Sequence, residues 1–170
     1  MTNTNTGHPP LIITRTLNAP LSLVWKVHSE AEHLAQWWGP VGKKLLVKKL
    51  EFRPEGIFHY GMEAPDGSMW WGRFLYRDIV PQQKLVYLSS FADENANVIR
   101  APFPGNFPLL VENTLSFQEH DGKTLLRLQG LPHDASATEQ AFFESMFTSM
   151  NGGFGATYDQ LDVYLAKLSG

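Results

Sequence analysis

The sequence of 170 residues contains no cysteine. This absence excludes a disulfide scaffold, a thiolate zinc site, an iron–sulfur cluster and a cysteine nucleophile. Charge is scarce as well, because 18% of the residues are charged, against about 25% in ordinary globular proteins. The net charge is −3, so the chain is mildly acidic. A chain of this kind is a poor candidate for nucleic-acid binding, and we expect none.

Long apolar runs are missing too. No stretch approaches the roughly 20 apolar residues that a membrane-spanning helix requires. The first ten residues are polar, end in two prolines and lack the apolar centre of a signal peptide. We therefore expect a cytoplasmic protein with no membrane span. Residues 1–10 are predicted to be a disordered tail, and residues 11–170 a single domain.

What the sequence has in excess is aromatic, with 5 Trp, 5 Tyr and 11 Phe. Residues 11–17 are rich in β-branched side chains and predict a strand. Residues 20–29 and 30–38 have helical spacing and predict two short helices, the second ended by Gly39-Pro40. Between residues 43 and 130, turn signals separate roughly seven short segments. This pattern predicts an antiparallel sheet.

Alternation along these segments predicts which face of the sheet is buried. In residues 69–80, Trp70, Phe74 and Tyr76 share one face, which should point inward, and Arg73 falls on the other face. In the segment around residue 113, Asn113 has the inward parity of its apolar neighbours. A buried amide needs hydrogen-bond partners, so Asn113 is either a structural hydrogen-bonding group or a ligand contact.

The last third predicts one long helix. Ser136 and Glu139 form a capping-box pattern, and apolar residues then recur in steps of three and four up to Leu168. Glycines at positions 152, 153 and 155 interrupt this helix, and each costs about 1 kcal/mol relative to alanine. They indicate either a bend or close approach to the sheet, or space left for a ligand.

Catalytic and metal-binding motifs are absent from the sequence. The six histidines have no metal-ligand spacing, and there is no nucleophile elbow, phosphate loop or dinucleotide fingerprint. We therefore expect no metal and no cofactor. His59 should face away from the core, since it alternates with Phe58 and Tyr60. Residues 93–108 are long for a connection and carry Phe103 and Phe107, which predicts a mobile lid.

Several ordered stretches carry a resemblance to a known family, among them APLSLVW, QWWGP, YRDIVPQQKLVY and GGFGATYDQL. From residue 11 to residue 168 the chain resembles the family of activators of heat-shock-protein (HSP-90) ATPase homologues, in the START-like (SRPBCC) superfamily. The resemblance implies an α+β helix-grip fold. In that fold a curved antiparallel β-sheet wraps around a long C-terminal α-helix, two short helices near the N-terminus close one end, and a cavity lies between.

Three functions remain open. The first is binding of a small hydrophobic molecule, as a carrier or sensor without chemistry, because an aromatic cavity needs only shape and a few polar groups. The second is an enzyme similar to polyketide cyclases and aromatases, for which Tyr60, Tyr76, Glu63 and Asn113 are the candidate acids, bases or polar groups. The third is interaction with a chaperone. Whether the chain forms a homodimer is left open.

Strand parity and helix period together predict the lining of the cavity. Methionines supply adaptable walls, and the mid-helix glycines leave room. The predicted ligand-binding residues are Phe58, Tyr60, Trp70, Phe74, Tyr76, Asn113, Met146, Met150, Gly153 and Phe154.

Overall fold

The computed structural model describes residues 8–169. The elements up to the end of the sheet follow the predicted order. Their bounds are β1 (Leu11–Leu17), α1 (Leu21–Ser29), α2 (Ala31–Trp37), β2 (Lys44–Leu50), β3 (Ile57–Glu63), β4 (Met69–Val80), β5 (Lys84–Ala92), β6 (Val98–Ile99), β7 (Leu110–His120), β8 (Lys123–His133), α3 (Ala137–Ser145) and α4 (Phe147–Ser169).

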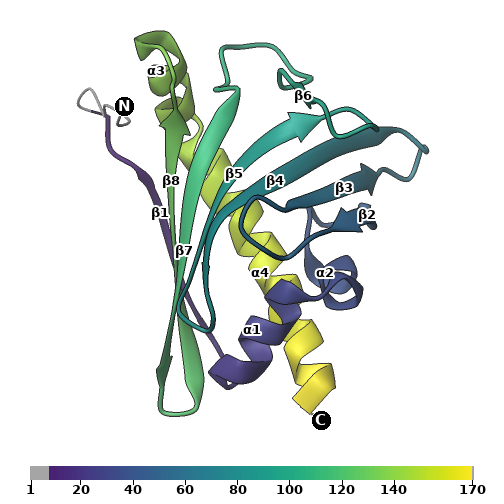
Figure 1. Ribbon diagram of the computed structural model, residues 1–170, viewed down its shortest axis with the longest axis vertical. Coiled ribbons are helices and arrows are strands. Elements are labelled where there is room, and N and C mark those ends of the chain that lie inside the picture. The colour runs from purple at the N-terminus through teal and green to yellow at the C-terminus, as the bar shows by residue number, and fades with distance from the viewer. Residues whose placement is uncertain (1–7, 170) are drawn as a thin grey trace.

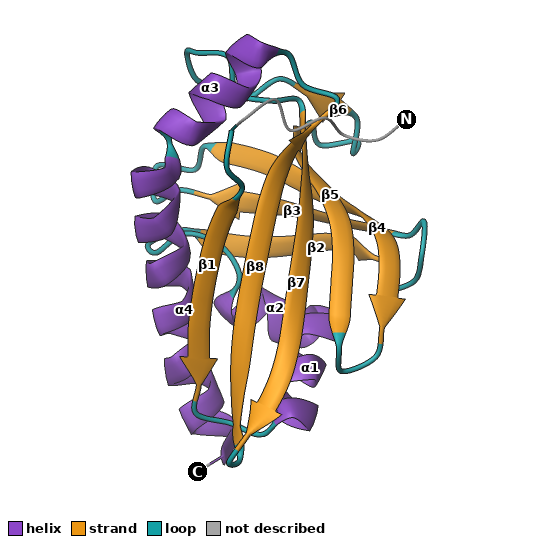
Figure 2. Ribbon diagram, turned by 90° about the vertical axis from the view of Figure 1, so that its left-hand side faces the viewer, coloured by secondary structure: helices purple, strands orange, loops and turns teal. Residues whose placement is uncertain are grey.

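One antiparallel sheet organises the described part of the chain. Its strand order is β1-β8-β7-β5-β4-β3-β2, and the short β6 pairs with β5. The sheet is curved, α4 crosses its concave face, and α1 and α2 close one end (Figure 1). Figure 2 shows α3 at the opposite end of the sheet from α1. The predicted α+β helix-grip fold is confirmed.

Alternation places the strand side chains as the sequence predicts. Phe74 and Tyr76 on β4 are buried, whereas Arg77 is exposed. On β7, Asn113 is buried together with Val111 and Leu115. These side chains form the concave face of the sheet, where apolar burial supplies most of the stabilisation of the fold.

The C-terminal helical region corrects the prediction of one long helix. The capping box is present, because Ser136 accepts a hydrogen bond from the backbone of Glu139 and the Glu139 side chain accepts one from the backbone of Ser136. The first helix, α3, ends before Met146, and α4 begins at Phe147. Phe143 and Phe147 pack edge to face across this break, with ring centroids 5.7 Å apart. The bend therefore falls at Met146 and not at the glycines, which lie inside α4.

An ion-pair cluster joins α4 to the edge strand β1. One guanidinium nitrogen of Arg15 lies 2.6 Å from an Asp159 oxygen and 2.5 Å from an Asp162 oxygen. The two carboxylates raise the pKa of Arg15. Of the predicted tail, residues 1–7 lie outside the described residues. His8 is described, and its Nδ1 lies 2.7 Å from a Glu144 carboxylate oxygen.

Candidate ligand-binding site

A pocket of about 190 Å³ lies between the concave face of the sheet and the first half of α4. It is larger than the cavity of about 150 Å³ that accepts benzene in an engineered protein core. The lining comes from strands β1, β3, β4, β5 and β7, from the chain after α2 and before β7, and from the helices α3 and α4. The lining residues are Leu11, Trp38, Tyr60, Met62, Gly72, Phe74, Tyr87, Ser89, Ser90, Phe91, Phe107, Val111, Asn113, Phe143, Met150 and Phe154.

Aromatic rings form much of the wall. Phe74 and Tyr87 stack with centroids 4.1 Å apart and an interplanar angle of 17°. Trp38 packs edge to face on Phe74 at 5.4 Å. Gly72 lies opposite Tyr60 in the register of β3 and β4, and a Cβ at Gly72 would lie 2.6 Å from the Tyr60 hydroxyl. Glycine is therefore required at position 72 because the tyrosine ring lies across its backbone.

Asn113 and Ser89 form a polar corner of the pocket, and Ser90 and the tyrosines Tyr60 and Tyr87 are the other lining residues with hydroxyl groups. The amide nitrogen of Asn113 donates to Ser89 Oγ at 2.8 Å and to the Val111 carbonyl at 3.1 Å. A carbonyl can only accept, so this contact identifies the nitrogen and oxygen of the Asn113 amide. Within residues 8–169, no donor lies within hydrogen-bonding distance of Asn113 Oδ1. This oxygen therefore stands as an available acceptor.

The electrostatic character of the pocket is neutral. The described residues that line it include no lysine, arginine, aspartate, glutamate or histidine. Burial raises the pKa of Tyr60 to about 12 and that of Tyr87 well above its ordinary value. Both hydroxyls are therefore protonated at neutral pH. A neutral ligand suits these surroundings, because burying an unpaired charge among apolar groups carries a large desolvation cost.

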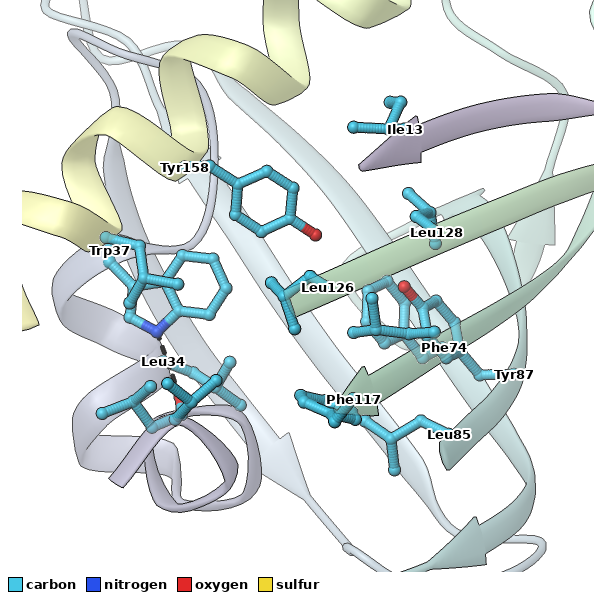
Figure 3. Close-up of a cluster of buried hydrophobic side chains, with 14 of the residues drawn as sticks. Ile13, Leu34, Trp37, Phe74, Leu85, Tyr87, Phe117, Leu126, Leu128 and Tyr158 are labelled. Atoms are coloured by element: carbon cyan, nitrogen blue, oxygen red, sulfur yellow. Dashed lines mark hydrogen bonds between the residues drawn. The ribbon is translucent and has the colours of Figure 1, made fainter. Parts of the chain in front are cut away.

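The other end of the space between sheet and helix is filled. Figure 3 shows Trp37 and Tyr158, whose rings stack with centroids 6.1 Å apart, and the Trp37 indole Nε1 donates to a backbone carbonyl, that of Val27, at 3.0 Å. A cavity of about 20 Å³ lies there, which is room for roughly one water molecule. It is bordered by His28, whose Nδ1 donates to the Val24 carbonyl at 2.7 Å. Burial lowers the pKa of His28 to about 4.

Half of the residues predicted to line a cavity do so. The residues that the structure brings together around the pocket are Tyr60, Phe74, Asn113, Met150 and Phe154. The other five are Phe58, Trp70, Tyr76, Met146 and Gly153, and none of them lines it.

Three of these five lie on the predicted face of the sheet, but at positions along their strands that do not reach the pocket. Phe58 is fully buried beneath Tyr60, with ring centroids 4.8 Å apart. Tyr76 borders the small cavity in the filled end. Trp70 is 37% exposed and packs on Phe91, outside the pocket. Parity gives the face, whereas distance along the strand decides which part of the interior a side chain reaches.

The two helical candidates require a correction for a different reason. Met146 lies at the break between α3 and α4, so its side chain does not follow the period of α4. Gly153 is exposed, and a Cβ built there or on Gly152 meets no atom within 4 Å. The glycines therefore neither approach the sheet nor leave room inside the pocket.

Sequence reasoning missed several lining residues. Tyr87 and Ser89 alternate along β5 with Phe91, and this period of two was a usable signal. Trp38 also lines the pocket, while its neighbour Trp37 is buried in the filled end. Leu11 and Phe143 come together only through the tertiary fold, because β1 and α3 are far apart in sequence.

The predicted lid contains more regular structure than the sequence indicated. The Asp93 carboxylate accepts hydrogen bonds from the backbone of Asn95 and Asn97, and β6 then pairs with β5. Phe107 reaches the pocket, and Phe103 packs on Phe107 at 5.8 Å. The mobility of this segment remains a prediction.

His59 lies on the face of β3 opposite the pocket, as alternation predicts. Its Nε2 lies 2.9 Å from the Asp93 carbonyl, and its ring packs on Trp71. Burial lowers its pKa. His59 therefore holds the turn after β5 against the sheet and does not reach the candidate site.

The curved sheet, the long crossing helix and the pocket between them define a helix-grip protein with an internal apolar site. The family described as "Activator of Hsp90 ATPase homolog 1-like protein" matches residues 18–166. The chain therefore belongs to this family, and the predicted resemblance is confirmed. No match to a curated protein was found. No helix within residues 8–169 has the length and apolar character needed to cross a membrane.

Solved structures share the fold. A crystal structure of a protein from Mycobacterium smegmatis is 26% identical, with a TM-score of 0.75, covering 96% of this chain and 94% of that one. A solution structure of an Arthrobacter aurescens protein is 21% identical, with a TM-score of 0.77 and coverage of 97% and 90%. The AHSA1 protein from Silicibacter pomeroyi is 16% identical, with a TM-score of 0.68 and coverage of 92% and 97%.

Proposed function

We propose that the protein reversibly binds a small, neutral, largely apolar molecule in the pocket beneath the first half of α4, as a carrier or sensor. The observation that carries this proposal is the pocket of about 190 Å³, whose walls are largely aromatic and apolar with a few uncharged polar groups. Concave apolar sites with few polar groups are typical of small-molecule binding. Met62 and Met150 add adaptable walls, because an unbranched thioether side chain adjusts to the shape of a ligand.

Binding without chemistry is better supported than a reaction similar to that of cyclases. General acid–base catalysis at neutral pH needs a group whose pKa lies near the working pH. Burial instead raises the pKa of Tyr60 and Tyr76 above their ordinary value. Glu63 is exposed and does not line the pocket, and Asn113 does not titrate. These placements favour a carrier or sensor.

Interaction with a chaperone remains a prediction from the family resemblance. The family description refers to activation of the Hsp90 ATPase. No feature of the pocket supports that activity for this chain. Stimulation of a purified chaperone ATPase by this protein would be the direct measurement.

The proposed function is tested with naphthalene, a neutral two-ring probe, in an NMR titration of the labelled protein. We expect saturable shifts at one site, centred on the pocket residues. Val111→Phe should abolish these shifts, because Val111 is buried in the pocket wall and the larger ring fills the space. Gly153→Leu is the matched control. It adds similar bulk on the exposed side of α4 and should leave binding unchanged.

Two results would contradict the proposal. One is the absence of saturable naphthalene binding to the wild-type protein. The other is unchanged binding in a folded Val111→Phe variant. Native mass spectrometry of the purified protein complements the titration, since a co-purifying small molecule would identify a natural ligand directly.

A further inference from the structure

The polar corner of the pocket has an unusual hydrogen-bond inventory. Both donor contacts of the Asn113 amide are made inside the protein, to Ser89 Oγ and to the Val111 carbonyl. The amide oxygen is left with no donor within residues 8–169. Asn113 is only 6% exposed and lines the pocket. Its amide oxygen is not among the fully buried, unpartnered side-chain atoms of the described residues, so it keeps contact with the pocket, where a ligand can supply the missing donor.

The neighbouring strand keeps this acceptor open. Gly130 is the register partner of Asn113 on β8, and it brings no side chain to the corner. A Cβ at Gly130 would lie 3.5 Å from Asn113 Oδ1 and 3.7 Å from the Phe143 ring. The oxygen therefore lies between a bare backbone and an aromatic ring. Neither of them can donate a conventional hydrogen bond to it from a side chain.

Ser89 supplies the complementary group. Its Oγ accepts the hydrogen bond from the Asn113 amide, and its own hydroxyl hydrogen remains available to donate. The corner therefore offers one acceptor, Asn113 Oδ1, and one donor, the hydroxyl of Ser89, whose Oγ contacts the nitrogen of the same amide. A hydroxyl group is the smallest neutral group that donates and accepts at the same time.

We infer that the ligand is an apolar, ring-sized molecule with one neutral hydroxyl group, which donates to Asn113 Oδ1 and accepts from Ser89 Oγ. This inference rests on the proposed function and adds the chemical class of the ligand. The rings fill the aromatic part of the pocket, and the hydroxyl selects molecules of phenol or alcohol type. Recognition of this kind is specific because a ligand without the hydroxyl leaves the buried polar atoms unpaired.

Three probes of similar ring size test the inference. Naphthalene has no polar group, 2-methoxynaphthalene only accepts, and 2-naphthol both donates and accepts. We expect wild-type protein to bind 2-naphthol about 3- to 10-fold more tightly than either of the other two, which corresponds to one neutral hydrogen bond. Dissociation constants come from NMR titrations at pH 7, where 2-naphthol is neutral.

Substitutions at Asn113 and Ser89 test whether the preference for 2-naphthol over naphthalene arises at the polar corner. Asn113→Leu keeps a similar volume and should reduce the 2-naphthol preference to about 1-fold while naphthalene still binds. Ser89→Ala removes only the hydroxyl and should lower the ratio of 2-naphthol affinity to naphthalene affinity. This variant also keeps the test decisive if Asn113→Leu does not fold.

The outcomes separate the two proposals. If naphthalene binds but 2-naphthol binds no more tightly, the hydroxyl inference is wrong and the proposed function stands. If the preference for 2-naphthol survives in Asn113→Leu, the corner is not its origin and the inference is overturned. If none of the three probes binds, the proposed function itself fails.

Discussion

The two halves of α4 cross the same sheet but bury very different amounts of side chain. In the second half, Tyr158, Leu161 and Leu165 are at most 3% exposed. In the first half, Met150 and Phe154 are only half-buried, because they overlook the pocket and not a filled core. Removal of apolar surface from water stabilises the fold roughly in proportion to the buried area. The second half therefore anchors the helix, and the first half forms the wall of a hollow.

The difference explains why glycines are tolerated in one half only. Gly152, Gly153 and Gly155 all lie in the first half, where added side chains would meet open space. Their cost in helix propensity is therefore not offset by close packing. We therefore expect amide exchange in the first half of α4 to be faster than in the second half.

The largest expected effect compares core truncations in the two halves. Leu161→Ala should reduce the free energy of unfolding by about 2 to 5 kcal/mol, because it leaves a cavity in a filled region. Met150→Ala should cost less than about 2 kcal/mol, since its side chain already borders empty space. Urea denaturation of both variants measures the difference. Equal losses would mean that the two halves pack alike.

The second-largest effect is a pH dependence of the free energy of unfolding, caused by His28 in the filled end. The pKa of His28 is about 4 in the folded protein, against about 6.5 in an unfolded chain. The unfolded state therefore binds more protons between these values, and stability falls as pH decreases from 6.5 towards 4. The loss from this group approaches about 3 kcal/mol. Urea titrations across this range should show the slope, and His28→Gln should reduce it.

The pocket beneath the first half of α4 provides the internal control for the pH experiment. Its described lining residues include no group that titrates near neutral pH, so probe binding should not change between pH 6 and 8. If the affinity for naphthalene changed with pH in this range, the pocket would contain or adjoin a titrating group. That result would contradict the view that His28 titrates in the filled end while the pocket stays neutral.

A smaller effect is expected from the glycines. Gly152→Ala and Gly153→Ala should each stabilise the protein by up to about 1 kcal/mol, because alanine favours helix and its methyl group meets no neighbour. Amide exchange in the first half of α4 should become slower. A destabilising result for both variants would show that the backbone at these positions has another constraint.

The smallest effect distinguishes parts of the predicted lid. Amide exchange should be slow at Asn97, whose backbone N–H is bonded to the Asp93 carboxylate. It should be faster between Pro102 and Asn106, where the chain is largely exposed. Hydrogen-exchange measurements report both segments at once. Uniformly slow exchange from residue 93 to residue 108 would identify a rigid loop and remove the lid hypothesis.

Much of the fold was predictable because its signals are local. The capping box at Ser136 begins a helix as predicted, and alternation places Phe74 and Asn113 on the concave face. The break at Met146 had no local signal, since no glycine or proline lies there. It follows from packing at the end of the sheet, where Phe143 and Phe147 pack against each other from two helices.

By itself, the sequence determined the order of the elements up to the end of the sheet, the buried face of strands such as β4 and β7, and the family. Only the tertiary structure decided which end of the space between sheet and helix is filled. Tyr76 and Phe74 have the same parity on one strand, yet Tyr76 borders only the filled end while Phe74 also lines the pocket. Periodicity specifies the direction of a side chain, because it arises from the backbone geometry of one segment. It cannot specify what lies opposite, because that depends on where the distant α2 and α4 cross the sheet.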